Sequence, residues 1–288
     1  MHIPMDKIYL LLIYIIAAPL AGGLMMGIDR KITARMQRRY GPPLLQPFYD
    51  VLKLFSKENL VVRRSQNMYI VFYLLFMVFT GALFFTGGDL LLVIFSLALA
   101  GIFLVLAGYK GSSPYSHIGA ERELLQMMAY EPMVLLTAVG MYMVTRSFSV
   151  GAIANYPVPL LLVLPGIFIG LIEALTIKLR KSPFDLATSH HGHQEIVKGV
   201  TVEYSGSALA MIELAHWYET ALLMGLIYLF WAVNPWIGVA LVLAAYFLEI
   251  WIDNAFARFR WEWMLKSTWG ATLIFGVGNI IALMLMRG

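Results

Sequence analysis

Residues 68–108 decide the fold, because they hold two apolar runs separated only by a turn. Met68–Thr86 reads MYIVFYLLFMVFTGALFFT, and Leu90–Gly108 reads LLLVIFSLALAGIFLVLAG, with Gly87-Gly88-Asp89 between them. Neither run contains a charged side chain. A bilayer-crossing helix needs about 20 consecutive apolar residues. This stretch therefore predicts two transmembrane helices joined by a short turn.

The composition extends this interpretation to the whole chain. Of 288 residues, 60% are hydrophobic and 13% are charged, whereas a soluble domain has about 25% charged residues. No polar stretch is long enough for a separate soluble core, so we expect a single polytopic membrane domain over residues 1–288. Cysteine is absent, which excludes disulfides and thiolate-ligated metal or iron–sulfur sites in this chain.

Eight apolar runs are long enough to cross a bilayer. The sequence thus predicts an all-α integral membrane protein with about eight transmembrane helices. The first run is too long for a signal peptide and lacks a basic leading region, so we expect it to remain as an anchor. The predicted spans are Ile8–Ile28, Met68–Thr86, Leu90–Gly108, Leu124–Thr145, Pro159–Leu179, Gly206–Val233, Trp236–Asp253 and Thr268–Met286.

The basic residues alternate between the loops and predict an orientation. The loops after spans one, three, five and seven hold nine, two, four and three Lys or Arg residues, if Lys178 is counted with the loop that it borders. The other side holds only Lys7, Arg146 and Arg287. Because basic loops stay in the cytoplasm, we expect both termini on the outer side of the cell membrane. The basic residues form no soluble patch of the kind that binds nucleic acid.

The first cytoplasmic loop contains a segment with amphipathic character, Leu44–Glu58. Its apolar residues share one helical face, its polar residues share the other, and Pro47 suits a first turn. We expect an amphipathic helix that lies on the membrane or against a partner.

Ionisable residues inside predicted spans are costly in a bilayer and usually mark a pathway. Measured from the basic side at the helical rise per residue, four carboxylates lie at depths on the order of 6–11 Å. They would form a lateral row in the membrane plane: Glu131, Glu173, Glu213 and Glu249.

Span six adds two further groups to this row. Glu213, His216 and Glu219 follow one another at spacings of three residues, which brings neighbours within side-chain reach, and Glu219 would lie about 20 Å deep. Proton relay is one hypothesis; structural pairing with cations is the other, and for Asp253 the two weigh equally. Few cations share this depth, because Lys178 and the two basic residues after it are expected at the rim. The candidate proton-transfer residues from this argument are Glu131, Glu173, Glu213, His216, Glu219, Glu249 and Asp253.

The third cytoplasmic loop carries a histidine cluster, His190, His191 and His193, followed by Glu195. The spacing is too tight for all three histidines to bind one ion from a single helical face, so no metal site is expected. Contact with a cytoplasmic partner is favoured, and a pH-sensitive hydrogen-bond network is a further option.

Charged residues at other loop ends have two interpretations. Arg38 and Arg39 would bind lipid headgroups or dock a soluble arm, and so would Arg258, Arg260 and Lys266. The cluster Glu121-Arg122-Glu123 would pair within a solvated loop or gate entry to the relay.

Several short motifs resemble those of one family, the complex I subunit that forms the quinone chamber. They occur in the family's order and extend over nearly the whole chain. They are Arg38-Arg39-Tyr40-Gly41-Pro42-Pro43 with Gln46-Pro47 and Lys53-Leu54, Gly119-Ala120-Glu121-Arg122-Glu123 with Tyr130-Glu131-Pro132, Ser182-Pro183-Phe184-Asp185, and Glu203-Tyr204-Ser205-Gly206.

The departures from this pattern narrow the resemblance. Complex I relatives carry an acidic stretch after Pro-Phe-Asp, whereas this chain has Ala187-Thr-Ser-His-His-Gly-His-Gln-Glu195-Ile-Val. That form resembles the membrane subunit of energy-converting (Ech-type, group 4) [NiFe] hydrogenases. The chain is also short for a quinone-reducing relative.

The resemblance implies a membrane anchor and proton conduit that does not itself catalyse a redox step. Such a subunit holds a soluble arm with hydrogenase large and small subunits and an iron–sulfur subunit, which oxidises ferredoxin and makes hydrogen at a nickel–iron centre. It links that arm to an antiporter-like membrane subunit that moves protons or sodium. The resemblance adds Glu203 to the conduit, and implies a partner interface at Arg38, Arg39, Glu121, Arg122, Glu123, Asp185, His190, His191, His193 and Glu195.

Two other functions stay open. A respiratory subunit lining a quinone pocket would support quinone reduction, and a free-standing ion transporter would work without a soluble partner. The motif-dense basic loops argue against the transporter, which has no need of a docking surface.

Overall fold

The computed structural model describes residues 5–58, 64–188 and 197–287. Within these ranges the ordered elements are helical, and the residues form no β-strand beyond one isolated bridge between Asp89 and Ser149. The all-α prediction is confirmed. The elements are α1 (Met5–Met36), α2 (Gln46–Phe55), α3 (Arg64–Phe85), α4 (Leu90–Tyr109), α5 (Pro114–Thr145), α6 (Val150–Ala154), α7 (Leu160–Val163), α8 (Pro165–Lys178), η1 (Gly199–Thr201), α9 (Gly206–Tyr228), η2 (Leu229–Trp231), α10 (Pro235–Ala255), α11 (Trp261–Ala271), η3 (Thr272–Val277) and α12 (Gly278–Arg287).

Six helices in the described part of the chain are long and apolar enough to cross a membrane. The two other predicted spans correspond to shorter or more polar helices. The fifth is divided at Leu164 into α7 and α8, and α8 has only 14 residues. The sixth, α9, carries two glutamates and a histidine among its 23 residues. The total of eight spans stays a prediction. The six helices are Lys7–Met36, Ser65–Phe85, Leu90–Tyr109, Pro114–Thr145, Pro235–Ala255 and Trp261–Met286.

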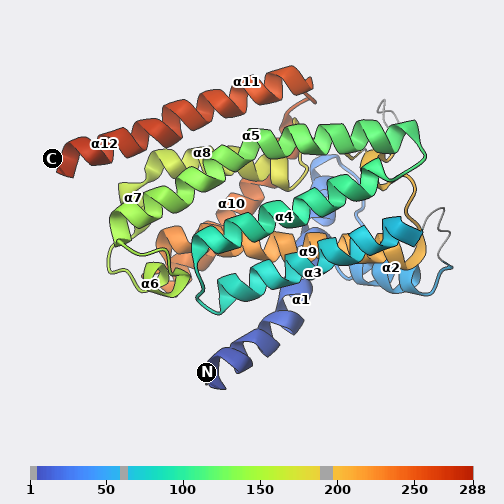
Figure 1. Cartoon of the computed structure of the whole chain (residues 1–288), viewed down its shortest axis with the longest axis horizontal. Coiled ribbons are helices and arrows are strands. Elements are labelled where there is room, and N and C mark those ends of the chain that lie inside the picture. The colour runs from blue at the N-terminus through green and yellow to red at the C-terminus, as the bar shows by residue number, and fades with distance from the viewer. Residues whose placement is uncertain (1–4, 59–63, 189–196, 288) are drawn as a thin grey trace.

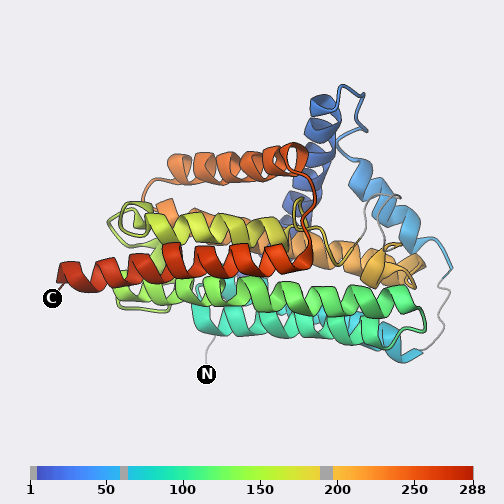
Figure 2. The same ribbon diagram turned by 90° about the horizontal axis from the view of Figure 1, so that it is seen from above.

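The helices pack mainly side by side, and α1 lies at a steep angle to the rest. Figure 1 shows α3, α4 and α5 as neighbours, with α9 in contact with α1, α2, α3 and α10. In Figure 2, α8 lies between α10 and the α11–α12 unit, and α1 rises across the bundle. Gly22 permits the crossing of α1 and α9, because a β-carbon at this position would collide with the backbone of Trp217. This close approach holds α1 directly against α9 at Trp217.

The predicted pair of helices in residues 68–108 is confirmed as α3 and α4. Asp89 ends the turn between them, and its carboxylate accepts hydrogen bonds from the backbone N–H groups of Leu91 and Leu92, at 2.9 and 3.1 Å. Such a cap satisfies donors that a helix N-terminus otherwise leaves free. The turn residues therefore set where α4 begins.

The amphipathic helix is confirmed as α2, with Pro47 in its first turn. Phe48 and Val51 pack toward α9, and the Phe48 ring lies 5.0 Å from that of Trp217. The expected apolar face is only partly covered, since Leu52 and Phe55 are 66% and 47% exposed. This uncovered part is the surface that α2 offers to lipid or to a partner.

Two helices extend beyond their predicted spans. The sequence predicted a loop at Glu121-Arg122-Glu123, but α5 begins at Pro114 and includes all three residues. Likewise α1 continues past Ile28 to Met36, through Asp29-Arg30-Lys31. Hydropathy marks the lipid-embedded part of a helix, whereas good helix formers extend the helix into the polar layer.

The segment after α8 folds into the bundle. Lys181 and residues 183–188 are buried, although a solvated loop was expected here. Lys178 was expected at the membrane rim; its side chain is only 7% exposed and is buried between helices, while its depth in the membrane stays a prediction. Because the chain turns into the bundle after α8, the two cations that follow it, Arg180 and Lys181, have side chains that are only 11% and 9% exposed.

Candidate functional site

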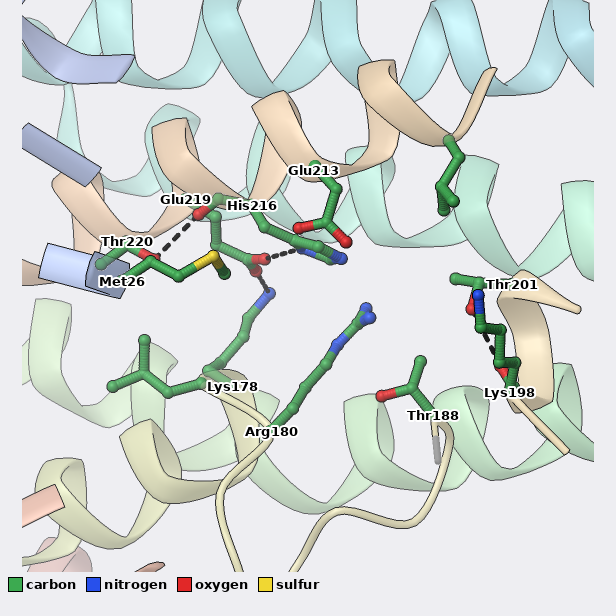
Figure 3. Close-up of a pocket in the computed structure, with 12 residues that line it drawn as sticks. Met26, Lys178, Arg180, Thr188, Lys198, Thr201, Glu213, His216, Glu219 and Thr220 are labelled. Carbon is green, nitrogen blue, oxygen red and sulfur yellow. Dashed lines mark hydrogen bonds and ion pairs between the residues drawn. The ribbon is translucent and has the colours of Figure 1, made fainter. Parts of the chain in front are cut away.

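The three ionisable residues of α9 face one cavity of about 270 Å³. Glu213, His216 and Glu219 share a helical face, as their spacing predicted. Figure 3 shows them directed from α9 toward Lys178 and Arg180. Thr188, Lys198 and Thr201 complete the opposite wall. The arrangement concentrates both signs of charge inside the bundle.

Lys178 is the counter-ion of Glu219. Its Nζ lies 2.6 Å from Oε1 of Glu219, and both side chains are buried. The same ammonium lies 4.7 Å from the centre of the Tyr130 ring on α5. Glu219 was expected about 20 Å deep and Lys178 at the rim, so the sequence did not predict this contact.

His216 connects the Glu219 pair to α3. Its Nδ1 lies 3.1 Å from the Tyr73 hydroxyl and 3.4 Å from Oε2 of Glu219. Because one ring nitrogen carries at most one proton, Nδ1 either accepts from Tyr73 or donates to Glu219. The position of a single proton thus decides which neighbour His216 binds.

Arg180 lies on the cavity wall opposite Glu213 (Figure 3). Its Nη2 donates to Oε1 of Glu123 at 3.3 Å, with both side chains about nine-tenths buried. Burial lowers the pKa of Arg180, but the charge of Glu123 outweighs it and the pKa rises above its ordinary value. Glu123 therefore pairs inside the bundle and not within a solvated loop.

Glu213 borders three cavities at once. Besides the 270 Å³ cavity, it lines one of about 180 Å³ under α2 and one of about 330 Å³ beside Asp29 and Asp253. Met26 on α1 lines the same three. Among the described residues Glu213 has no hydrogen-bond or ion-pair partner, and its side chain borders space in which water could reach it.

Asp253 lies in a second charged cluster. Lys181 bonds to Asp29 on α1 and contacts Asp253 on α10 at 3.2 Å, and the backbone N–H of Ser182 donates to Asp253 at 2.8 Å. Burial lowers the pKa of Lys181, but the two carboxylates raise it above its ordinary value. These contacts fit the structural pairing weighed for Asp253; its role in proton transfer stays a prediction.

Glu249 on α10 is fully buried, and neither carboxyl oxygen has a hydrogen-bond partner in the described part of the chain. Thr176 of α8 lies beside it, but the Thr176 hydroxyl donates to the carbonyl of Ile172 at 3.1 Å. A buried acid without a partner is costly to ionise.

The other members of the predicted row lie apart. Glu131 and Glu173 are partly buried, and Glu173 faces Ser267 and Thr268 on α11. No ion pair or hydrogen bond joins Glu131, Glu173, Glu213 and Glu249 to one another across the residues that the structure describes. Their passage of protons as a row stays a prediction, with water as the required link.

Glu203 is held by the turn between α4 and α5. Its carboxylate accepts from the backbone N–H groups of Ser112 and Ser113 at 2.6–2.9 Å, and from Nε2 of Gln66 at 2.8 Å. It lies at the N-terminus of α5, where a negative charge is favourable. These contacts indicate an anchor for the turn.

The predicted partner-interface residues fall into two groups. Arg38, Arg39 and Glu121 are exposed. Asp185 is 4% exposed and lies 3.5 Å from Arg258, while Arg122 donates to the Leu186 carbonyl at 3.4 Å. The structure does not describe the predicted interface residues His190, His191, His193 and Glu195. In the part of the chain that it does describe, no cluster of three metal-ligating side chains occurs.

Sequence reasoning missed the partners of the α9 acids. Lys178 fell inside the predicted span Pro159–Leu179, and a lysine within a span is itself a signal for a buried counter-ion. Tyr73, Tyr130 and Met26 gave no such signal, because aromatic and Met residues in spans usually pack against lipid or helices.

Apolar helices with ion pairs buried between them define an all-helical, multi-pass membrane protein with a charged interior. Residues 8–284 match the family described as NADH dehydrogenase. The chain belongs to this family, as the motif resemblance predicted.

Three known proteins illustrate the relationship. NADH-ubiquinone oxidoreductase chain 1 of Paracentrotus lividus is 31% identical over 307 residues, covering 94% of this chain and 93% of that protein. Hydrogenase-4 component C of Escherichia coli (strain K12) is 34% identical over 205 residues, covering 65% of this chain and 64% of that protein. A chain of the membrane-bound sulfane sulfur reductase, an archaeal respiratory membrane complex, has a TM-score of 0.84 at 26% identity, covering 96% of this chain and 99% of that one.

Proposed function

We propose that this chain is the membrane anchor and proton-conduit subunit of a ferredoxin-dependent, energy-converting [NiFe] hydrogenase. It would link hydrogen chemistry in soluble partner subunits to proton or sodium movement in an antiporter-like membrane subunit. The observation that carries the conduit is the buried sequence of contacts Tyr73–His216–Glu219–Lys178, beside the open carboxyl of Glu213. The chain has no cysteine, so thiolate ligands for nickel, iron or iron–sulfur clusters would come from partners.

The proposed path begins at Glu213, which takes a proton from water in the cavities around it. His216, one turn away, receives the proton and donates it from Nδ1 to Glu219, giving up its bond to Tyr73. A proton on Glu219 removes the charge that holds Lys178. Lys178, which already lies over the Tyr130 ring, is then free to turn toward the neighbouring Glu131, so the signal passes from α9 to α5.

The hydrogenase assignment rests on sequence similarity. The 34% identity with hydrogenase-4 component C supports it, as does the histidine-containing segment after Pro-Phe-Asp. In this arrangement the basic cytoplasmic loops hold the soluble arm, and both termini lie on the outer side.

A second candidate is a quinone-site subunit of a complex I-type dehydrogenase. The 31% identity with NADH-ubiquinone oxidoreductase chain 1 over nearly the whole chain favours it. Against it, six of the twelve residues that line the 270 Å³ cavity are ionisable, namely Lys178, Arg180, Lys198, Glu213, His216 and Glu219. An apolar isoprenoid tail gains little beside such side chains.

Purification of the intact complex separates the two candidates. The hydrogenase proposal expects bound nickel and hydrogen evolution from reduced ferredoxin. A complex without nickel that reduces quinone, and is blocked by inhibitors that compete with quinone, would establish the second candidate instead.

A further inference from the structure

A cavity of about 310 Å³ lies at the connection between α10 and α11, away from the acids of α9. Its walls come from α5, from the buried segment after α8 and from the connection itself. The lining residues are Arg122, Leu186, Arg258, Phe259, Arg260 and Trp261. The proposed conduit uses none of them.

Three of the six lining side chains are guanidinium groups, and none is a carboxylate. Two are positioned by the protein: Arg122 donates to the Leu186 carbonyl at 3.4 Å, and Arg258 lies 3.5 Å from the buried Asp185. Asp185 offsets part of the positive charge of the three arginines. The N-terminus of α11, at Trp261, adds further positive potential at the cavity edge.

The rim of the cavity is aromatic and exposed. Phe259 and Trp261 line the cavity and are 44% and 43% exposed. Phe256 and Trp263, close to them in the chain, are 49% and 62% exposed. Aromatic rings of this kind collect at the headgroup level of a bilayer. Beyond them the α11–α12 unit presents an apolar surface, on which Leu273 and Ile274 are 60% and 70% exposed.

We propose that this cavity binds the phosphate of an anionic phospholipid, with the acyl chains lying along α11 and η3. Guanidinium groups bind phosphate oxygens through paired, charge-assisted hydrogen bonds. Basic pockets between transmembrane helices are suited to anionic headgroups. The combination of an arginine-lined cavity, an aromatic rim and an apolar helix beneath it matches the three parts of a phospholipid in order.

The apolar surface decides between a lipid and the other sources of an anion. Free phosphate would need only the arginines, and an acidic peptide of a partner would leave Leu273 and Ile274 uncovered. Only a lipid uses the arginines, the exposed rings and the apolar helix face together.

The test uses the intact complex, extracted in mild detergent and analysed by native mass spectrometry for retained phosphatidylglycerol. Arg260→Gln is the informative variant, because its backbone carbonyl still accepts from Trp263 and the start of α11 is kept. Arg35→Gln is the matched control, since Arg35 is an exposed arginine on α1 outside this cavity. A second measurement compares the melting temperature of the delipidated complex with phosphatidylglycerol, phosphatidylcholine or inorganic phosphate added.

We expect wild type and Arg35→Gln to retain phosphatidylglycerol and to be stabilised by it. The Arg260→Gln complex should bind phosphatidylglycerol roughly tenfold more weakly, because one charge-assisted contact is lost. Its melting temperature in phosphatidylcholine should equal that of the wild type. Equal retention by Arg260→Gln would overturn the proposal. So would the same stabilisation by inorganic phosphate alone, or release of a partner subunit by Arg260→Gln with no change in bound lipid.

Discussion

The ammonium of Lys178 lies 2.6 Å from the carboxylate of Glu219, although 41 residues separate them in the chain. The two side chains come from α8 and α9 and are 7% and 8% exposed. A pair so deeply buried is costly to desolvate, and each partner becomes costly to leave alone. The contact therefore fixes α8 against α9 and sets the charge state around His216.

Removal of Lys178 tests this dependence. Lys178→Met should destabilise the chain by about 3–5 kcal/mol, because Glu219 is left as an unpaired buried charge. The double variant Lys178→Met/Glu219→Gln should recover most of that stability, since neither member of the pair is then a buried, unpaired charge. Thermal unfolding of the purified complex measures both. Equal melting temperatures for the single and double variants would contradict the pair's role.

Glu213→Gln should abolish proton pumping while the complex still assembles. The amide keeps the size of the side chain but cannot carry the proton, and Glu213 has no described partner whose loss would unfold the site. Acidification of reconstituted vesicles during hydrogen evolution measures pumping. Glu58→Gln removes an exposed charge that has no place in the proposed path and serves as the control. Unchanged pumping in Glu213→Gln would exclude the relay through this residue.

Glu203→Gln should act on stability and not on transport. The amide loses an anionic acceptor for the N–H groups of Ser112 and Ser113, at a cost of about 1–3 kcal/mol. Melting temperature and proton transport should be measured on the same preparation. Normal stability with lost transport would instead support the proton-transfer role predicted from the sequence.

The contact between α1 and α2 should depend on pH. Burial raises the pKa of Asp50, but hydrogen bonds from Arg30 and Gln46 outweigh it and hold the pKa below its ordinary value. A lowered folded-state pKa stabilises the contact above the ordinary Asp value of about 3.9, and this gain is lost as pH falls through the lower folded value.

The rate of amide hydrogen exchange in α2, after correction for the pH dependence of intrinsic exchange, should therefore rise when the pH falls below about 4. In Asp50→Asn the pH-dependent part should be absent. The same pH dependence in both proteins would show that another group controls α2.

Much of the fold followed from hydropathy. The runs at Met68–Thr86 and Leu90–Gly108 predicted α3 and α4 because lipid demands long apolar segments. The spacing of Glu213, His216 and Glu219 also predicted their common face, since helical periodicity is local.

The contacts of these acids could not be predicted in the same way. Depth was counted along each helix from an assumed rim, and α8 ends inside the bundle. The burial of residues 183–188 is a tertiary effect, because their sequence contains polar and charged side chains that suit a loop. The anchoring of Glu203 by the turn before α5 is likewise set by packing between distant segments.

The short helix α8 has an electrical consequence. Its 14 residues span about 21 Å and the four residues of α7 add about 6 Å, together less than the hydrocarbon thickness of about 30 Å. The charged groups that follow it, together with the cavities around Glu213, form a polarisable medium reaching inward from one face. Transmembrane voltage falls mainly across material that does not polarise, so the electric field is focused on the thinner apolar remainder. Moving one elementary charge across the whole membrane changes its energy by roughly 2.3 kcal/mol per 100 mV. Where the field is focused, a charge that moves only a short distance experiences much of this change.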